Sequence, residues 1–91
     1  MTDVETIAIL KKAIKQYGNE SQRRMAIEAM SELTKALCKW ERGFYNLDEI
    51  AEELADVFIM LQQLILIFDF GESFDYWYET KLLRLNKNLD R

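Results

Sequence analysis

The chain has 91 residues, a mass of 10.8 kDa and a formal net charge of −4, because 16 Asp and Glu outnumber 12 Lys and Arg. This length predicts one domain over residues 1–91, and the acidic balance argues against a general nucleic-acid-binding protein. Apolar residues make up 49% of the chain, which excludes a disordered polymer. Because histidine is absent, acid–base or metal chemistry has to rest on carboxylates.

Three glycines divide the chain into four segments that contain no helix breaker. Glycine is common just past a helix end because it adopts positive φ without a Cβ clash, and Gly18, Gly43 and Gly71 therefore predict three turns. We expect four helices over 3–17, 20–41, 47–69 and 73–89. The predicted caps of the last three helices are Asn19 or Ser21, Asn46 or Asp48, and Ser73.

The third predicted helix is apolar nearly all round. Its main stripe recurs at spacings of three and four, and Phe58, Ile59, Ile65 and Leu66 lie off that stripe. Such a helix needs cover on both sides, which four short helices of one chain supply poorly. We therefore expect an all-α fold whose four-helix bundle is completed by homo-oligomerisation, with the third helix near the interface.

Two carboxylates of the third predicted helix lie on its apolar side, where a hydrophobic core would have apolar residues. At 100° per residue, Glu53 lies within the apolar arc around Val57 and Asp56 lies at its edge, while Glu32 offers a third carboxylate from the second helix. A buried carboxylate is costly unless a cation or metal pairs with it. Oxygen ligands without histidine suit Mg²⁺ or Mn²⁺ rather than Zn²⁺. The alternative is that these acids are solvated helix-face charges or ion-pair partners.

Two acidic blocks carry a resemblance to a known family. The first is Glu28-Ala29-Met30-Ser31-Glu32 and the second is Glu53-Leu54-Ala55-Asp56, with twenty residues separating Glu32 from Glu53. The chain resembles the MazG-like all-α nucleoside triphosphate pyrophosphohydrolases, and within them the short members common in phages and firmicutes, whose hallmark is EExxE followed by ExxD. The resemblance covers residues 17–84.

The resemblance implies a helical bundle that assembles as a homodimer or homotetramer. It also implies Mg²⁺-dependent cleavage of a nucleoside triphosphate to a nucleoside monophosphate and pyrophosphate. The implied metal ligands are Glu32, Glu53 and Asp56, and the catalytic candidates are Glu28 and Glu53. Ala29 stands where the family has a glutamate that is usually a ligand, which leaves open a catalytically impaired protein that binds or sequesters nucleotides.

Basic residues are the candidates for holding the substrate phosphates. Lys81 and Arg84 are three residues apart on the fourth predicted helix and so share a face. The resemblance implies that such cations in the last helix contact phosphates, and Lys35 is a further candidate. The alternative is a solvated face.

A third interpretation is a structural helical module that binds another protein through its aromatic residues. The run from Phe74 to Tyr78 is dense enough in aromatics to form an interface. This interpretation predicts that Glu53 pairs with a lysine or arginine and that metal does not change thermal stability.

The expected location is the cytoplasm, and the resemblance implies that of a bacterium or of a phage-infected host cell. The single cysteine, Cys38, cannot form an internal disulfide, and Asp3 and Glu5 lie where a secretory signal would be basic and then apolar. The apolar stretch 54–70 is too short and too interrupted by polar residues to span a bilayer. We therefore expect neither a membrane nor a nucleic acid as partner.

Overall fold

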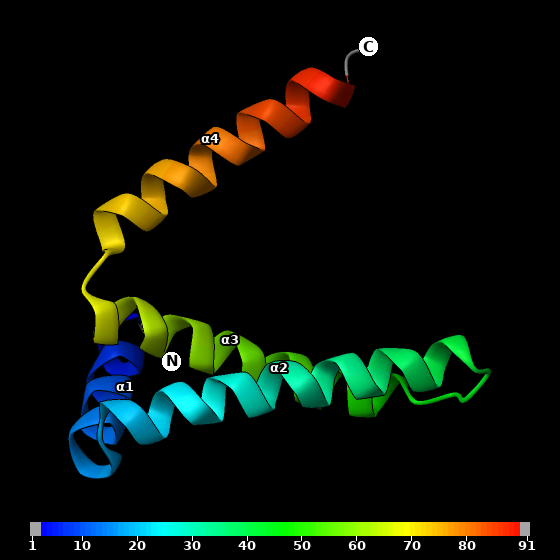
Figure 1. Cartoon of the computed structure of the whole chain (residues 1–91), viewed down its shortest axis with the longest axis horizontal. Coiled ribbons are helices and arrows are strands. Elements are labelled where there is room, and N and C mark those ends of the chain that lie inside the picture. The colour runs from blue at the N-terminus through cyan, green and yellow to red at the C-terminus, as the bar shows by residue number, and fades with distance from the viewer. Residues whose placement is uncertain (1–2, 90–91) are drawn as a thin grey trace.

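The computed structural model describes residues 3–89, which form four α-helices and no strand (Figure 1). Helix α1 spans Asp3–Tyr17, α2 spans Asn19–Glu41, α3 spans Leu47–Phe68 and α4 spans Gly71–Leu89. The all-α prediction is therefore confirmed. None of the helices in this described range is long and apolar enough to cross a membrane.

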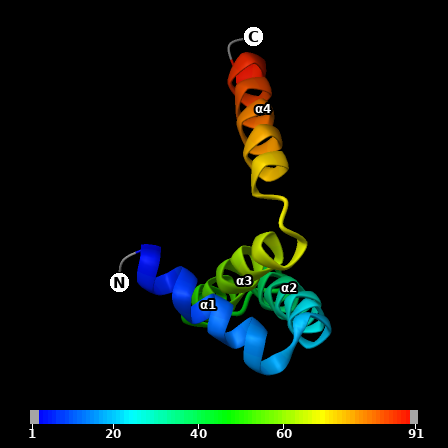
Figure 2. The ribbon, with the colours of Figure 1, turned by 90° about the vertical axis from the view of Figure 1, so that its left-hand side faces the viewer.

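Helices α2 and α3 form an antiparallel hairpin, and α1 packs across the end of that hairpin where α2 begins (Figures 1 and 2). The small core between these three helices is made of apolar side chains from each of them. Its buried members are Leu10, Ala26, Ala36, Val57 and Met60. Two of the five are alanines, which allows the backbones of α2 and α3 to approach closely and fixes which of their residues face one another.

Two of the three predicted glycine turns are confirmed. Gly18 has a φ of 92° and Gly43 a φ of 96°, both in the region that a side chain disfavours. The third prediction is wrong, because Asp69 adopts the left-handed conformation at φ 51° and Gly71 is the first residue of α4. Aspartate is one of the few non-glycine residues that adopts this conformation routinely.

Of the predicted helix caps, only Asn46 occupies the cap position of its helix. Helix α2 begins at Asn19, and the carbonyl oxygen of Gly18 accepts a hydrogen bond from the Gln22 amide at 3.1 Å, so neither Asn19 nor Ser21 occupies the cap position. Asn46 does occupy the cap position of α3, but its side chain makes no capping hydrogen bond. Because α4 starts at Gly71, Ser73 lies inside its first turn.

Helix α4 projects away from the other three helices. It leaves α3 through Asp69 and Phe70 and contacts α3 only near this junction, as Figure 2 shows from the side. No residue between Gly71 and Leu89 is buried. A single chain thus shows a three-helix unit with a protruding fourth helix, and the completion of a bundle by further copies stays a prediction.

Candidate metal centre

The acidic residues of the two blocks meet in one pocket between α2 and α3. Its volume is ≈ 230 Å³. Glu28 and Glu32 line it from α2, and Glu53 and Asp56 line it from α3. Its apolar lining consists of Met25, Ala29, Ile59 and Met60.

The core of the hairpin determines this meeting. Buried Ala26 and Ala36 turn one side of α2 toward α3, and buried Val57 and Met60 turn one side of α3 toward α2. Residues three and four positions apart share a helix face. Glu32 lies four residues before Ala36, and Glu53 lies four residues before Val57, so the two acids lie on the sides of α2 and α3 that face one another. The angular argument from sequence alone therefore predicted that Glu32, Glu53 and Asp56 face one another, and the three line one pocket.

Among the four acids of the pocket, Glu53 is the most buried and is repelled by the negative charges of its neighbours. Its side chain is half-buried, whereas Glu28, Glu32 and Asp56 are exposed. Burial raises the pKa of Glu53 above its ordinary value, and the negative charges of Asp56 and Glu32 raise it further. In the part of the chain that the structure describes, no lysine or arginine forms an ion pair with any of these acids. The ion-pair alternative for Glu53 is thus not realised there.

The donor set suits a hard divalent cation. Carboxylate oxygens without nitrogen or sulfur ligands are typical of Mg²⁺ and Mn²⁺ sites. Over residues 3–89, no three Asp, Glu or Cys side chains stand close enough together to hold an ion in the conformations of this structure. Binding a cation would therefore require rotamer changes, which the exposed Glu32 and Asp56 can make freely.

Two further residues of the first block line the pocket, and only Glu28 differs from what its helical angle suggests. The helical angle of Glu28 lies farther from the apolar arc than that of Glu32, yet Glu28 lines the same pocket. Ala29 is half-buried in the pocket wall, at the position where the family motif has its second glutamate. The pocket therefore has a fourth carboxylate, from Glu28, but has a methyl group where a further oxygen ligand is expected.

The three predicted phosphate-binding cations lie outside the pocket of their own chain. Lys81 and Arg84 are exposed on α4, well away from the α2–α3 hairpin (Figure 1). Lys35 is exposed on α2 and does not line the pocket. Within one chain, the structure does not bring these cations to the acidic residues.

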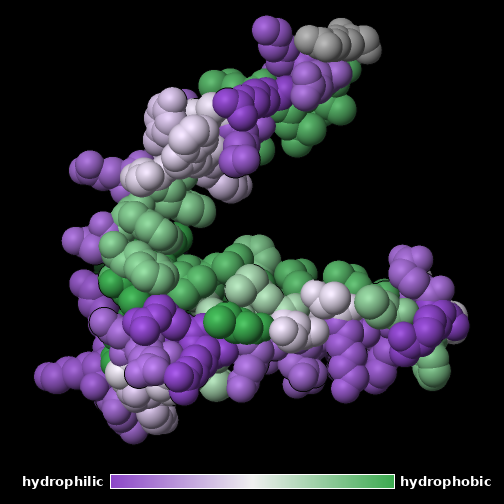
Figure 3. Space-filling view, in the orientation of Figure 1, coloured by the Kyte–Doolittle hydropathy of each residue, from purple (hydrophilic) through white to green (hydrophobic). Residues whose placement is uncertain are grey.

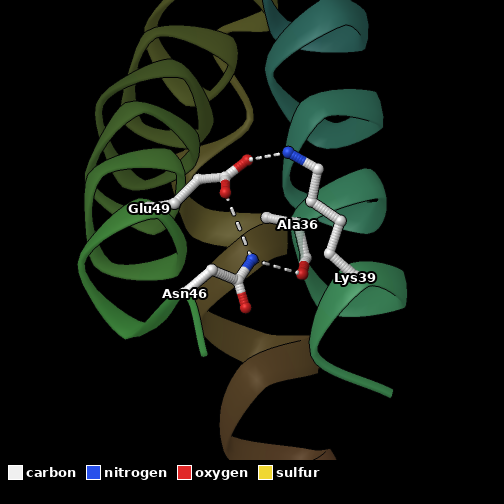
Figure 4. Close-up of polar contacts among 4 residues, drawn as sticks. All are labelled: Ala36, Lys39, Asn46 and Glu49. Atoms are coloured by element: carbon white, nitrogen blue, oxygen red, sulfur yellow. Dashed lines mark hydrogen bonds and ion pairs between the residues drawn. The ribbon is translucent and has the colours of Figure 1, made fainter. Parts of the chain in front are cut away.

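A polar network beside the turn of the hairpin, where α2 ends and α3 begins, was not predicted (Figure 4). The side-chain amide of Asn46 donates to the Ala36 carbonyl oxygen at 3.0 Å and to Glu49 Oε2 at 3.2 Å. Lys39 Nζ lies 3.2 Å from Glu49 Oε1. The hydrogen bond from Asn46 lowers the pKa of Glu49, and Lys39 lowers it further. The signal in the sequence was the spacing of Asn46 and Glu49, three residues apart as in a capping box.

This network fixes the register of the hairpin next to the pocket. Asn46 and Glu49 belong to the start of α3, and Ala36 and Lys39 belong to the end of α2, so the contacts join the two helices directly. Glu32 lies one turn before Ala36, and Glu53 lies one turn after Glu49. The network therefore holds the two halves of the acidic pocket opposite one another.

Comparison of the chain with models of protein families, with curated proteins and with solved structures finds no match.

Proposed function

We propose that this chain is a Mg²⁺-dependent nucleotide pyrophosphohydrolase of the MazG-like type, which converts a nucleoside triphosphate to a nucleoside monophosphate and pyrophosphate. The observation that carries the proposal is the convergence of Glu28, Glu32, Glu53 and Asp56 in one pocket with no cation of the described chain to neutralise them. A bound divalent cation would relieve that repulsion and attract a polyphosphate.

The proposed roles follow from burial and position. Glu32, Glu53 and Asp56 would hold the cation, which supplies charge neutralisation on the phosphates and polarises the bond to be broken. Glu28, at the exposed rim of the pocket, would orient a water for in-line attack and accept its proton. Mn²⁺ fits the same oxygen ligands.

Ala29 supports a second candidate, a protein that binds or sequesters nucleotides without turning them over. The methyl group of Ala29 lies in the pocket wall at a position where a glutamate would add one more oxygen and one more negative charge. Losing that ligand weakens the cation site on which hydrolysis depends. Nucleotide binding depends less on a fully ligated cation.

We further propose that the protein acts as a homo-oligomer, either a dimer or a tetramer. Lys81 and Arg84 lie on the protruding α4, outside the acidic pocket of their own chain, and association through α4 would bring them to the pocket of another copy. Cations placed there would hold a triphosphate and stabilise the charge that develops on it.

Pyrophosphate release from a panel of NTPs and dNTPs with Mg²⁺ or Mn²⁺ tests the enzymatic proposal. We expect release by the native chain and none by the Glu53→Gln variant. A nucleotide that binds tightly and is recovered unchanged supports the sequestering candidate instead. The Ala29→Glu variant then separates the two, because a large gain in rate identifies a degraded enzyme.

The same measurements test the third interpretation, a structural module. That interpretation predicts no pyrophosphate release and a melting temperature that does not respond to Mg²⁺. A melting temperature that rises with Mg²⁺ contradicts it, because only a ligand that binds the folded state stabilises by mass action.

A further inference from the structure

The inner sides of α3 and α4 form an open V that is lined by apolar side chains. At the closed end of the V, a groove of ≈ 650 Å³ is lined from α3 by residues that include Phe58 and Leu61, and from α4 by Phe74 and Tyr78. Figure 3 shows hydrophobic side chains along the side of α3 that faces α4 and around the junction. The V is therefore an apolar surface without cover in a single chain.

Helical spacing extends both walls of the groove toward the open end of the V. On α4, steps of three and four residues lead from Tyr78 to Leu82 and Leu85, which are 49% and 53% exposed. On α3, one turn back from Phe58 lies Leu54, which is 42% exposed. Each helix thus carries a continuous apolar row, and neither row has a partner along most of its length.

The solvent-accessible area of the chain is larger than that of a compact monomer by more than one partner's share of a stable interface. A compact monomer of this mass exposes roughly 5,500 Å², whereas this chain exposes 7555 Å². The excess of roughly 2,000 Å² is larger than the area of about 800 Å² that one partner contributes to a standard stable interface. The excess is therefore large enough for a stable interface with a second copy.

Charge then selects the orientation of the covering helix. Every charged residue of α3 is acidic and lies between Leu47 and Asp56, and the second half of α3 has none. Helix α4 is divided the other way, with acidic residues in its first half and basic residues in its second. These are Glu72, Asp75 and Glu79, followed by Lys81, Arg84 and Lys87. An α4 that packs antiparallel to α3 sets bases beside acids, whereas a parallel one sets acids beside acids.

We propose that a second copy of this chain covers both rows about a twofold axis, with the α4 of each copy packed antiparallel to the α3 of the other. The two α3 and the two α4 helices then form one four-helix bundle around the apolar rows. This isologous exchange gives both rows the same partner. It does not depend on the proposed chemistry of the acidic pocket.

The first test is the oligomeric state of the native chain, measured by light scattering and by sedimentation. We expect a dimer, or a tetramer built from dimers, at micromolar concentration. A monomer at every concentration overturns the proposal, since α4 would then fold back on its own α3 or require a different protein.

Single-cysteine variants test the orientation. In a C38S background, copies that carry L85C and copies that carry L54C are produced together and oxidised. Antiparallel packing predicts a disulfide between the L85C and L54C thiols, identified by mass spectrometry of the linked peptides. It predicts no link between the L85C and F68C thiols in a mixture of those two variants, because Phe68 is at the opposite end of α3. The reverse pattern overturns the proposed orientation.

Charge reversal tests the complementarity. The K81E/R84E/K87E variant places acids beside the acidic half of α3, and we expect its dimer dissociation constant to rise by ~10-fold or more. The matched control is K11E/K12E/K15E, which changes the net charge equally on exposed positions of α1. An equal effect of both variants overturns the assigned interface, and circular dichroism verifies that each remains helical.

Discussion

At the scale of single residues, Glu53 carries an unfavourable charge in the folded protein. Burial and the neighbouring acids raise its pKa above the ordinary value of 4.5, so the folded state binds its proton more tightly than the unfolded state does. The contribution of Glu53 to stability is therefore most favourable below that ordinary value and is lost as the pH rises through the raised pKa. The Glu53→Gln variant removes this dependence.

We expect Glu53→Gln to match or exceed the melting temperature of the native chain at pH 7 in the presence of EDTA, with the advantage disappearing below pH 4.5. With Mg²⁺ the order should reverse, because the native carboxylate gains a ligand and the amide does not. Melting curves from pH 4 to 8 with and without Mg²⁺ measure both effects. A lower melting temperature of the variant in EDTA would show that Glu53 has a stabilising partner instead.

Asn46 makes the opposite contribution, since its amide donates one hydrogen bond across the hairpin to the Ala36 carbonyl and one to Glu49 on its own side. The Asn46→Ala variant loses the bonds to the Ala36 carbonyl and to Glu49, and we expect it to lower the free energy of unfolding by about 1–3 kcal/mol. Urea titration measures this loss. The control is Gln16→Ala at an exposed position of α1, where no comparable loss is expected.

The sequence predicted the acidic residues of the site better than its basic ones. Helical angles identified Glu32, Glu53 and Asp56 because their positions depend only on the packing of two adjacent helices in one hairpin. The positions of Lys81 and Arg84 depend on where α4 packs, and helical periodicity does not specify the partner of an amphipathic row. The Asn46 network was missed because the spacing of Asn46 and Glu49 is equally typical of a simple helix cap.

At the scale of elements, two glycines near the helix junctions differ in whether their backbone conformation requires glycine. Gly43 has a φ of 96° and open space where a Cβ would lie, so a side chain there costs backbone strain and nothing else. Gly71 is helical, and an added Cβ would make only an ordinary contact of 3.9 Å with Ile65 Cγ2. One glycine is needed for its conformation, and the other is not.

We therefore expect opposite effects from the same substitution at these two sites. Gly43→Ala should lower the free energy of unfolding by about 1 kcal/mol, because alanine disfavours positive φ. Gly71→Ala should raise it by up to about 1 kcal/mol, because alanine has the higher helix propensity. Urea titration of both variants at one protein concentration measures the pair. A stabilising Gly43→Ala would contradict the assigned turn conformation.

The helices themselves were predictable from sequence for two reasons. Each helix is much longer than the few residues by which its ends are uncertain, and its apolar residues recur at spacings of three and four. The junction between α3 and α4 was not, because Asp69 rather than a glycine adopts the left-handed conformation there. Asp69 and Phe70 together form the junction at which α4 leaves the hairpin. Local propensity predicts that a turn exists near residue 70, but the angle between the two helices depends on which residue makes it.

At the scale of the whole molecule, folding and association are expected to be one process. A chain whose fourth helix has no buried residue gains little from ordering that helix alone, and in the proposed dimer the stability of α4 comes from contacts with another copy. Obligate dimers of this kind have a melting temperature that depends on protein concentration, because dilution favours the separated and unfolded chains.

We expect the melting temperature of the native chain to rise by roughly 3–5 °C for each tenfold increase in protein concentration, the shift that one factor of ten in association produces for a dimer of this size. The K81E/R84E/K87E variant, which weakens association, should melt at a lower temperature at every concentration tested. The K11E/K12E/K15E variant should follow the native curve. If the melting temperature of the native chain is independent of concentration over two orders of magnitude, its α4 is stabilised within one chain, and the exchange of α4 between copies is wrong.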